Sequence, residues 1–235
     1  MERTELTCWL RLLLTEGIGR TSGRKLLAAF GLPEAVFEQS AAALEHIVTP
    51  AQADALLQEP PELAEQVQTT WQWLQAEPDT RRLLTLGDAL YPQRLLETED
   101  PPLLLFASGM AAAWQHNLLN SSATACMAIV GSRNPTPQGA ENARQFAAAM
   151  AQAGLCVVSG MAMGVDGAAH EGALQGALQG VLPSALSATA PGALATIAVV
   201  GTGLDRVYPR QHRDLAHRIT AHGLLLSELP LGSGP

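Results

Sequence analysis

The chain is poor in aromatic residues, in charged residues and in cysteine, and these shortages narrow the class of protein. Aromatic residues make up only 4% of the 235 residues, so the core must be built mainly from alanine, leucine and valine. Charged residues make up 15% and hydrophobic residues 47%, which excludes a disordered chain because enough apolar surface is present to form a core. The length fits one large domain or two modest ones.

Cysteine is too scattered for a disulfide framework or a metal site. Cys8, Cys126 and Cys156 are odd in number, far apart and set in apolar sequence, so we expect buried, reduced thiols in a cytoplasmic protein. The histidines near the C-terminal end are five residues apart, which does not keep them on one helix face. The sequence therefore predicts no metal site.

Long apolar runs and an excess of basic residues are also absent. No apolar segment follows a basic start at the N-terminus, and the most apolar stretch, residues 173–200, is interrupted by glutamine, proline and serine. We therefore expect neither a signal peptide nor a membrane span. The formal net charge of −8 argues against a generally basic nucleic-acid-binding protein, although it leaves room for a local basic groove.

Helical periodicity over residues 1–76 predicts an all-helical first domain. A Gly17–Gly19 turn separates its first two helices, an arrangement that resembles a helix-hairpin-helix or a sterile-alpha-motif-like bundle. Such hairpin turns contact DNA phosphates, and Arg20 and Arg24 lie nearby. The simpler interpretation is a tight turn between packed helices. The last helix is expected to have Trp71 on its apolar face, with Trp73 also a packing residue, and residues 77–79 mark the domain boundary.

Apolar runs alternate with helical segments in the second predicted domain, residues 80–235. Strands are expected at 82–86, 103–107, 128–131, 155–159, 196–200 and 224–227, and the main helices at 137–153, 165–177 and 209–221. Non-alternating apolar strands, each followed by a helix, predict a parallel sheet covered on both faces. This domain is therefore expected to be a doubly wound, Rossmann-like α/β domain. Residues 176–195 are of low complexity and break the rhythm, so we interpret them as an insertion.

The turn Gly131-Ser132-Arg133 is the strongest candidate for a binding site. It follows an apolar strand and precedes a helix that Thr136 can cap and that Pro137 can begin. A helix N-terminus offers free N–H groups and a partial positive charge to an anion. We therefore predict that this turn binds a phosphodiester backbone.

Three further predicted strands end in similar turns, and all four ends should meet at one edge of a parallel sheet. They combine a close backbone approach with a hydroxyl, a chemistry typical of phosphate cradles. The predicted DNA-binding residues are Gly131, Ser132, Arg133, Ser159, Gly160, Gly164, Gly201, Thr202 and Gly203, and the fourth end is Ser227-Glu228.

Catalysis and cofactor binding are disfavoured by the spacing of these motifs. Neither the dinucleotide fingerprint nor a Walker A sequence occurs, and no nucleophile elbow is present, so no cofactor is expected. Asp166 and His170 lie four residues apart on a predicted helix. We interpret Asp166 as holding the Gly164 turn and His170 as packing beneath the site. Tyr208 is interpreted as part of a turn that orders the next helix.

Several stretches together resemble the DprA/Smf (DNA-processing protein A) family. They are A-I-V-G-S-R at 128–133, V-V-S-G-M-A-M-G-V-D-G-A-A-H at 157–170, T-I-A-V-V-G-T-G-L-D-R-V-Y-P-R-Q-H at 196–212 and L-L-S-E-L-P-L-G at 225–232. The resemblance implies a non-catalytic protein that binds single-stranded DNA, protects incoming DNA, loads the recombinase RecA during natural transformation, and forms a homodimer when full length. It also implies that Arg133 contacts a DNA phosphate.

Two departures from the family and two alternatives remain. The chain ends where the family continues into a Phe- and Arg-rich segment, so the Rossmann-like domain is expected to be incomplete; the 176–195 insertion is the second departure. One alternative is a nucleoside monophosphate phosphoribohydrolase of the LOG type, which shares the G-S-R turn, although the P-G-G-x-G-T-x-x-E signature of that family is missing. The other is a truncated, non-functional homologue.

Overall fold

The computed structural model describes residues 1–122, 124–179 and 193–235, and the chain divides into two compact units. The first unit comprises Met1–Glu77, Thr85–Asp88 and Arg94–Leu104, and the second contains the rest. The last helix of the first 77 residues ends at Ala76, next to the predicted boundary, but the first unit also takes two short segments from beyond it. Most of the predicted insertion at 176–195 lies outside the described residues.

Six helices form the first unit around a leucine-rich core. They are α1 (Arg3–Leu14), α2 (Arg20–Phe30), α3 (Pro33–Phe37), α4 (Ala41–Glu45), α5 (Pro50–Leu57) and α6 (Leu63–Ala76). Thr49 caps α5 and Gly17, at φ 75°, turns the chain between α1 and α2. The core cluster contains Leu12, Leu26, Leu44 and Leu56 together with Leu103. Residue Trp73 of α6 is buried and Trp71 only partly so, which corrects the predicted face of this helix.

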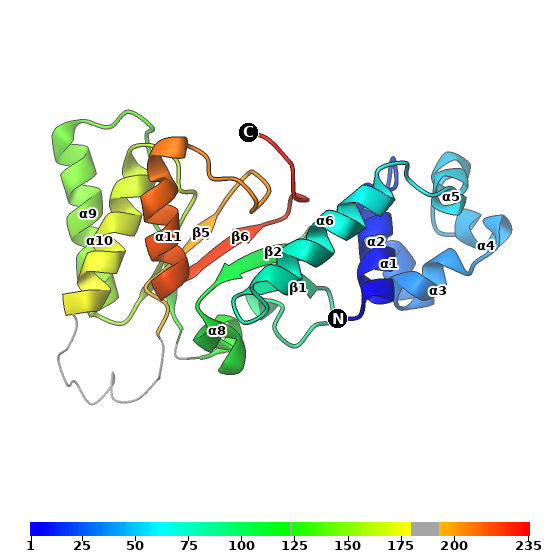
Figure 1. Cartoon of the computed structure of the whole chain (residues 1–235), viewed down its shortest axis with the longest axis horizontal. Coiled ribbons are helices and arrows are strands. Elements are labelled where there is room, and N and C mark those ends of the chain that lie inside the picture. The colour runs from blue at the N-terminus through cyan, green and yellow to red at the C-terminus, as the bar shows by residue number, and fades with distance from the viewer. Residues whose placement is uncertain (123, 180–192) are drawn as a thin grey trace. The chain divides into compact units, whose positions relative to one another are not determined.

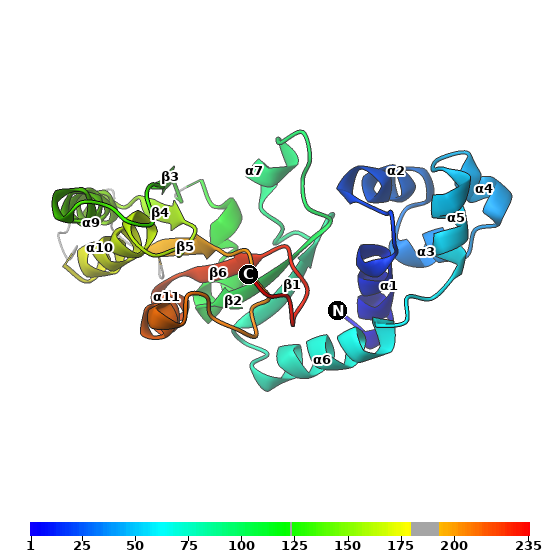
Figure 2. The ribbon, with the colours of Figure 1, turned by 90° about the horizontal axis from the view of Figure 1, so that it is seen from above.

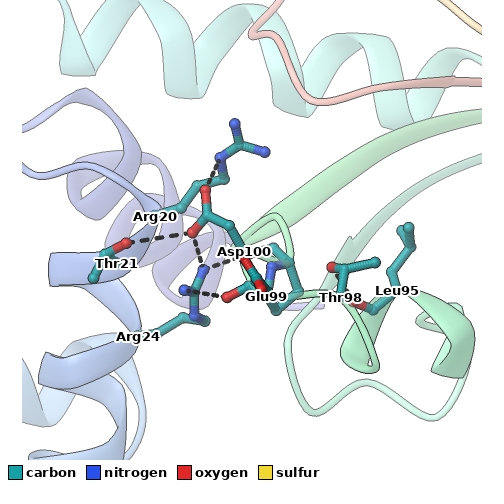
Figure 3. A network of polar contacts seen from close by, with 8 residues as sticks. Arg20, Thr21, Arg24, Leu95, Thr98, Glu99 and Asp100 are labelled. Carbon is teal, nitrogen blue, oxygen red and sulfur yellow. Dashed lines mark hydrogen bonds and ion pairs between the residues drawn. The ribbon is translucent and has the colours of Figure 1, made fainter.

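The arginines beside the Gly17–Gly19 turn are held by Asp100 (Figure 3). Arg20 Nε lies 3.0 Å from one carboxylate oxygen of Asp100, and Arg24 Nη1 lies 2.5 Å from the other. Arg24 also donates to the carbonyl oxygens of Pro101 and Glu99. The hydrogen bond from Arg24 and the charges of both guanidinium groups lower the pKa of the Asp100 carboxyl. These contacts favour the structural interpretation of the turn over a DNA contact.

A six-stranded mixed sheet forms the centre of the second unit (Figures 1 and 2). Its strands are β1 (Arg81–Thr85), β2 (Leu104–Gly109), β3 (Cys126–Ala128), β4 (Cys156–Ser159), β5 (Thr196–Val199) and β6 (Leu224–Ser227), in the spatial order β1-β2-β6-β5-β4-β3. β3 to β6 are parallel, whereas β2 pairs antiparallel with β6. The predicted α/β, Rossmann-like fold class is confirmed.

Three helices connect the parallel strands: α9 (Pro137–Gln152), α10 (Val165–Gln179) and α11 (Arg213–His222). Because β3 to β6 lie side by side in chain order, right-handed crossovers place these helices on one face of the sheet, as Figure 2 shows. The sequence predicted helices on both faces, but a reversal of strand order is not found among the described residues. The remaining helices are short: α7 (Gln93–Leu96), α8 (Ala111–Gln115), η1 (Leu118–Asn120) and η2 (Arg210–His212).

Glycines allow α9 and α10 to pack closely. A β-carbon added at Gly172 would lie 2.0 Å from the Arg144 carbonyl oxygen, and one at Gly176 would lie 2.2 Å from that of Ala148. Glu171 of α10 forms an ion pair with Arg218 of α11, which ties the next helix to this pair. The three crossover helices are thus fixed against one another.

β3 lies at the sheet edge, and all three of its residues are exposed. Cys126 is therefore exposed, which corrects the prediction of three buried thiols; its register partner Cys156 is buried and Cys8 is half-buried. The interaction with the neighbouring Cys126 thiol, together with burial, raises the pKa of the Cys156 thiol. No helix in the described part of the chain is both long and apolar enough to cross a membrane.

Candidate functional site

The turn after β3 leads directly into α9. Asn134 N–H donates to the Ser132 hydroxyl at 3.0 Å, which closes a local turn. Thr136 accepts from Gly139 N–H at 3.1 Å and caps α9, whose first residue is Pro137, so the predicted helix start is confirmed. Arg133 is exposed on this turn. Across the described residues its guanidinium has neither a hydrogen bond nor an ion pair.

The turn between β4 and α10 is hydrogen-bonded to the turn that carries Arg133. Val165 N–H donates to the Ser132 carbonyl oxygen at 3.1 Å, and the buried carboxylate of Asp166 accepts from Ala162 N–H at 3.3 Å. Gly164 has φ 88°, and a β-carbon there would lie 2.4 Å from the Ser132 carbonyl oxygen. Asp166 thus holds the Gly164 loop, as the sequence predicted.

We expect Gly164→Ala to destabilise the protein by about 2 kcal/mol, because alanine meets both a positive φ and a backbone carbonyl. Thermal unfolding monitored by circular dichroism measures the effect. Gly201→Ala is the matched control, since no heavy atom lies within 4 Å of a β-carbon at that position. Equal melting temperatures for the two variants would show that Gly164 is not required by the turn.

Most hydroxyl groups at the strand ends serve the fold. Ser159 Oγ donates to the Ile129 carbonyl oxygen at 2.6 Å, and Ser227 Oγ donates to that of Thr202 at 2.7 Å. Both serines are buried, and their hydroxyl hydrogens are used in these bonds within the fold. Thr202 differs: its Oγ1 is buried and has no hydrogen-bond partner among the described residues. An unsatisfied buried hydroxyl is costly unless a ligand or water completes it.

The glycines at the strand ends also fall into two groups, those packed within the turns and those that are exposed. Gly203 N–H donates to the Ser233 carbonyl oxygen at 3.1 Å, and a β-carbon at Gly203 would lie 2.7 Å from the Pro230 carbonyl oxygen. Gly131 packs against Val165, where an added β-carbon would lie 2.9 Å from a methyl group. Gly160 and Gly201 are exposed, although an added β-carbon at Gly160 would lie 2.8 Å from an Asp166 carboxylate oxygen. The first two glycines shape the turns, and the last two remain accessible.

A cavity of about 390 Å³ lies at the carboxyl edge of the parallel strands. Four of the nine predicted site residues line it: Arg133, Gly160, Gly201 and Thr202. Gly131, Ser132, Ser159, Gly164 and Gly203 do not line it, and they shape or hold the surrounding turns. As DNA contacts, all nine remain predictions.

The sequence missed the apolar part of the cavity lining. Met163 and Tyr208 line it and are 43% and 51% exposed. The sequence predicts only a structural role for Tyr208, in the turn before the next helix. The signal that could have identified it is its place in the loop after β5, because loops at this edge gather around ligands.

A buried histidine lies beneath the loops. Thr196 Oγ1 donates to the Val157 carbonyl oxygen at 2.7 Å, so it must accept from His170 Nδ1–H at 2.7 Å. In the neutral imidazole Nε2 is then unprotonated, and this atom is buried with no hydrogen-bond partner in the part of the chain that the structure describes. Burial, with a smaller contribution from His212, lowers the pKa of His170 to about 4. A neutral, buried imidazole bound to a threonine fits the predicted packing role better than acid–base catalysis.

A second, more open cavity of about 580 Å³ lies over η2 and α11. It is lined by basic side chains, among them Arg206, Arg210, Arg213 and His217, and by Asp205, which accepts from Gly232 N–H at 2.8 Å. The chain has a negative net charge, but the lining of this cavity provides a local basic surface.

Comparisons with known proteins agree with the motifs. Residues 82–235 match the family described as DNA recombination-mediator protein A. Protein Smf from Synechocystis sp. is 36% identical over 154 residues, which is 66% of this chain and 34% of that protein. The chain thus spans about a third of the length of this curated relative.

Two solved structures are similar. DNA processing protein A from Streptococcus pneumoniae has a TM-score of 0.68 and 26% identity, covering 100% of this chain and 70% of that one. A second DNA processing protein A, from Helicobacter pylori, was described for its single-stranded DNA binding mode. It has a TM-score of 0.47 and 29% identity, covering 61% of this chain and 55% of that one.

Proposed function

Because the chain belongs to the DNA recombination-mediator protein A family, we propose that it binds single-stranded DNA in the cavity at Arg133. The observation that most supports this proposal is that the guanidinium of Arg133 is exposed. It borders this cavity and has no internal partner among the described residues. Several other arginines, including Arg24, Arg144 and Arg218, are already paired with carboxylates. A free arginine beside accessible glycine backbone suits a phosphate.

The proposed binding reads the backbone and not the base sequence. Arginine and backbone N–H groups contact phosphate oxygens, which every nucleotide shares. The basic side chains over η2 and α11, Arg210 and Arg213 among them, provide further positive charge on the same unit. We therefore expect affinity to fall steeply with salt and to change little with base composition.

We propose no catalytic step. Asp166 is engaged with the Ala162 amide and His170 is buried against Thr196, so support for an acid–base pair at the cavity is lacking. The alternative is cleavage of nucleoside monophosphates. Incubation with AMP and chromatography for free adenine tests it directly, and released adenine would favour that enzyme.

The wider role is proposed for the whole protein. Family membership supports a mediator that protects incoming DNA, loads RecA onto it during natural transformation and forms a homodimer when full length. The RecA step is measured as DNA-dependent ATP hydrolysis by RecA on strands precoated with a single-strand-binding protein. Faster onset of hydrolysis with this chain present supports loading.

Fluorescence anisotropy with a labelled oligonucleotide tests DNA binding itself. Unlabelled single strands should displace the label at much lower concentration than unlabelled duplex of the same sequence. Equal competition by both forms, or no binding at low salt, would contradict the proposal. A cooperative thermal melt of the same preparation distinguishes lack of binding from lack of folding, which addresses the alternative of a non-functional product.

A further inference from the structure

An exposed tyrosine borders the cavity that Arg133 lines. Tyr208 is 51% exposed, whereas the chain's other tyrosine, Tyr91, is 1% exposed. Aromatic residues make up only 4% of the chain, and a large ring normally contributes most when it is buried. The exposed ring of Tyr208 therefore leaves an apolar face available to a ligand in the cavity.

The cavity lining has a cationic part and an apolar part. Arg133 and the exposed backbone of Gly160 and Gly201 supply the polar part. Tyr208 and Met163, which is 43% exposed, supply apolar surface. A nucleotide has the same two parts, because its phosphate is anionic and its base offers flat apolar faces.

A ligand that fills this cavity should use both parts of its lining. A bare phosphate held at Arg133 leaves the apolar surface of Tyr208 and Met163 unused, whereas a nucleotide can cover both parts. Thr202, which is 3% exposed, completes the lining beside Gly201.

We propose that Tyr208 is the stacking platform for one unpaired nucleobase whose phosphate Arg133 holds. This inference rests on the proposed function and names the part of the strand that enters the cavity. The volume of about 390 Å³ is near the lower end of the roughly 300–1,000 Å³ typical of ligand sites, which suits a single nucleotide. Stacking accepts every base, because each base has a π-face.

The test compares normal and abasic oligonucleotides of equal length. Anisotropy titrations at one low salt concentration measure binding of labelled oligothymidylate and of a labelled all-abasic strand. Free thymidine monophosphate is the unlabelled competitor. Tyr208→Ala and Tyr208→Leu should weaken binding of oligothymidylate roughly tenfold, as expected for loss of one base stack, and should leave abasic binding unchanged. Tyr208→Phe keeps the ring and should bind like the parent. Circular dichroism melts check that each variant folds.

The possible outcomes distinguish failure of the stacking role from failure of the proposed binding of single-stranded DNA. If the parent chain binds neither strand, the proposed function fails and the stacking role falls with it. If the parent binds both strands but Tyr208→Leu weakens both equally, or neither, only the stacking role is overturned. Competition by thymidine monophosphate as effective as that by the strand would identify a free nucleotide as the ligand and would overturn the assignment to DNA.

Discussion

Lowering the pH from 6.5 to 4 should cost the folded protein about 3 kcal/mol of stability through His170 alone. The pKa of this imidazole is lowered from 6.5 to about 4, mainly by burial. Between these two values the unfolded chain binds the proton and the folded chain does not, so the free energy of unfolding falls as the pH falls. Above pH 6.5 and below pH 4 the contribution of His170 is constant. Urea unfolding at a series of pH values measures the loss.

His170→Asn is the control for this prediction. An asparagine amide can replace Nδ1–H as the donor to Thr196 but cannot titrate. Carboxylates that titrate in the same range affect both proteins, so the difference between the two stability curves isolates the histidine. The account expects this difference to change by about 3 kcal/mol between pH 6.5 and pH 4. Parallel curves would show that His170 is not a buried neutral imidazole.

Arg133→Ala should weaken binding of single-stranded DNA by about 10- to 100-fold at low salt. A charge-assisted hydrogen bond contributes about 1.5–3 kcal/mol. The guanidinium of Arg133 can form this bond without first breaking an ion pair or hydrogen bond among the described residues. Removing one phosphate contact should also reduce the slope of log K against log salt by about 0.7. Anisotropy titrations at several salt concentrations measure both quantities.

Arg144→Ala is the matched control for Arg133→Ala. It removes the same charge from the same unit, but Arg144 lies on α9 and is paired with Glu141 at 2.5 Å. Its affinity and salt slope should remain close to those of the parent. A similar loss in both variants would mean that net charge, and not a bound phosphate at Arg133, determines the affinity.

The elements of the fold could be predicted because their signals are local. Thr136 and Pro137 mark the start of α9 by side-chain chemistry that needs no distant partner. The order of the strands is not local, and this explains the exposed Cys126. Its strand is as apolar as a central strand, yet it lies at the edge of the sheet.

The site was predictable to the extent that it depends on position along the chain. The carboxyl ends of parallel strands share one edge of the sheet. The proximity of Arg133, Gly160 and Gly201 could therefore be predicted from the sequence. The partners of the hydroxyl groups could not, because the acceptors of Ser159 and Ser227 are carbonyl groups on neighbouring segments. The exposure of Tyr208 depends on the same tertiary packing.

The central claim is that the cavity at the strand ends holds a nucleic-acid phosphate. Amide chemical-shift mapping by NMR, with an unlabelled single strand titrated into isotope-labelled protein, tests it most directly. We expect shifts concentrated at Arg133, Gly160, Gly201, Thr202 and Tyr208. Shifts concentrated on the Gly17–Gly19 turn and α2, with the cavity residues unchanged, would contradict it.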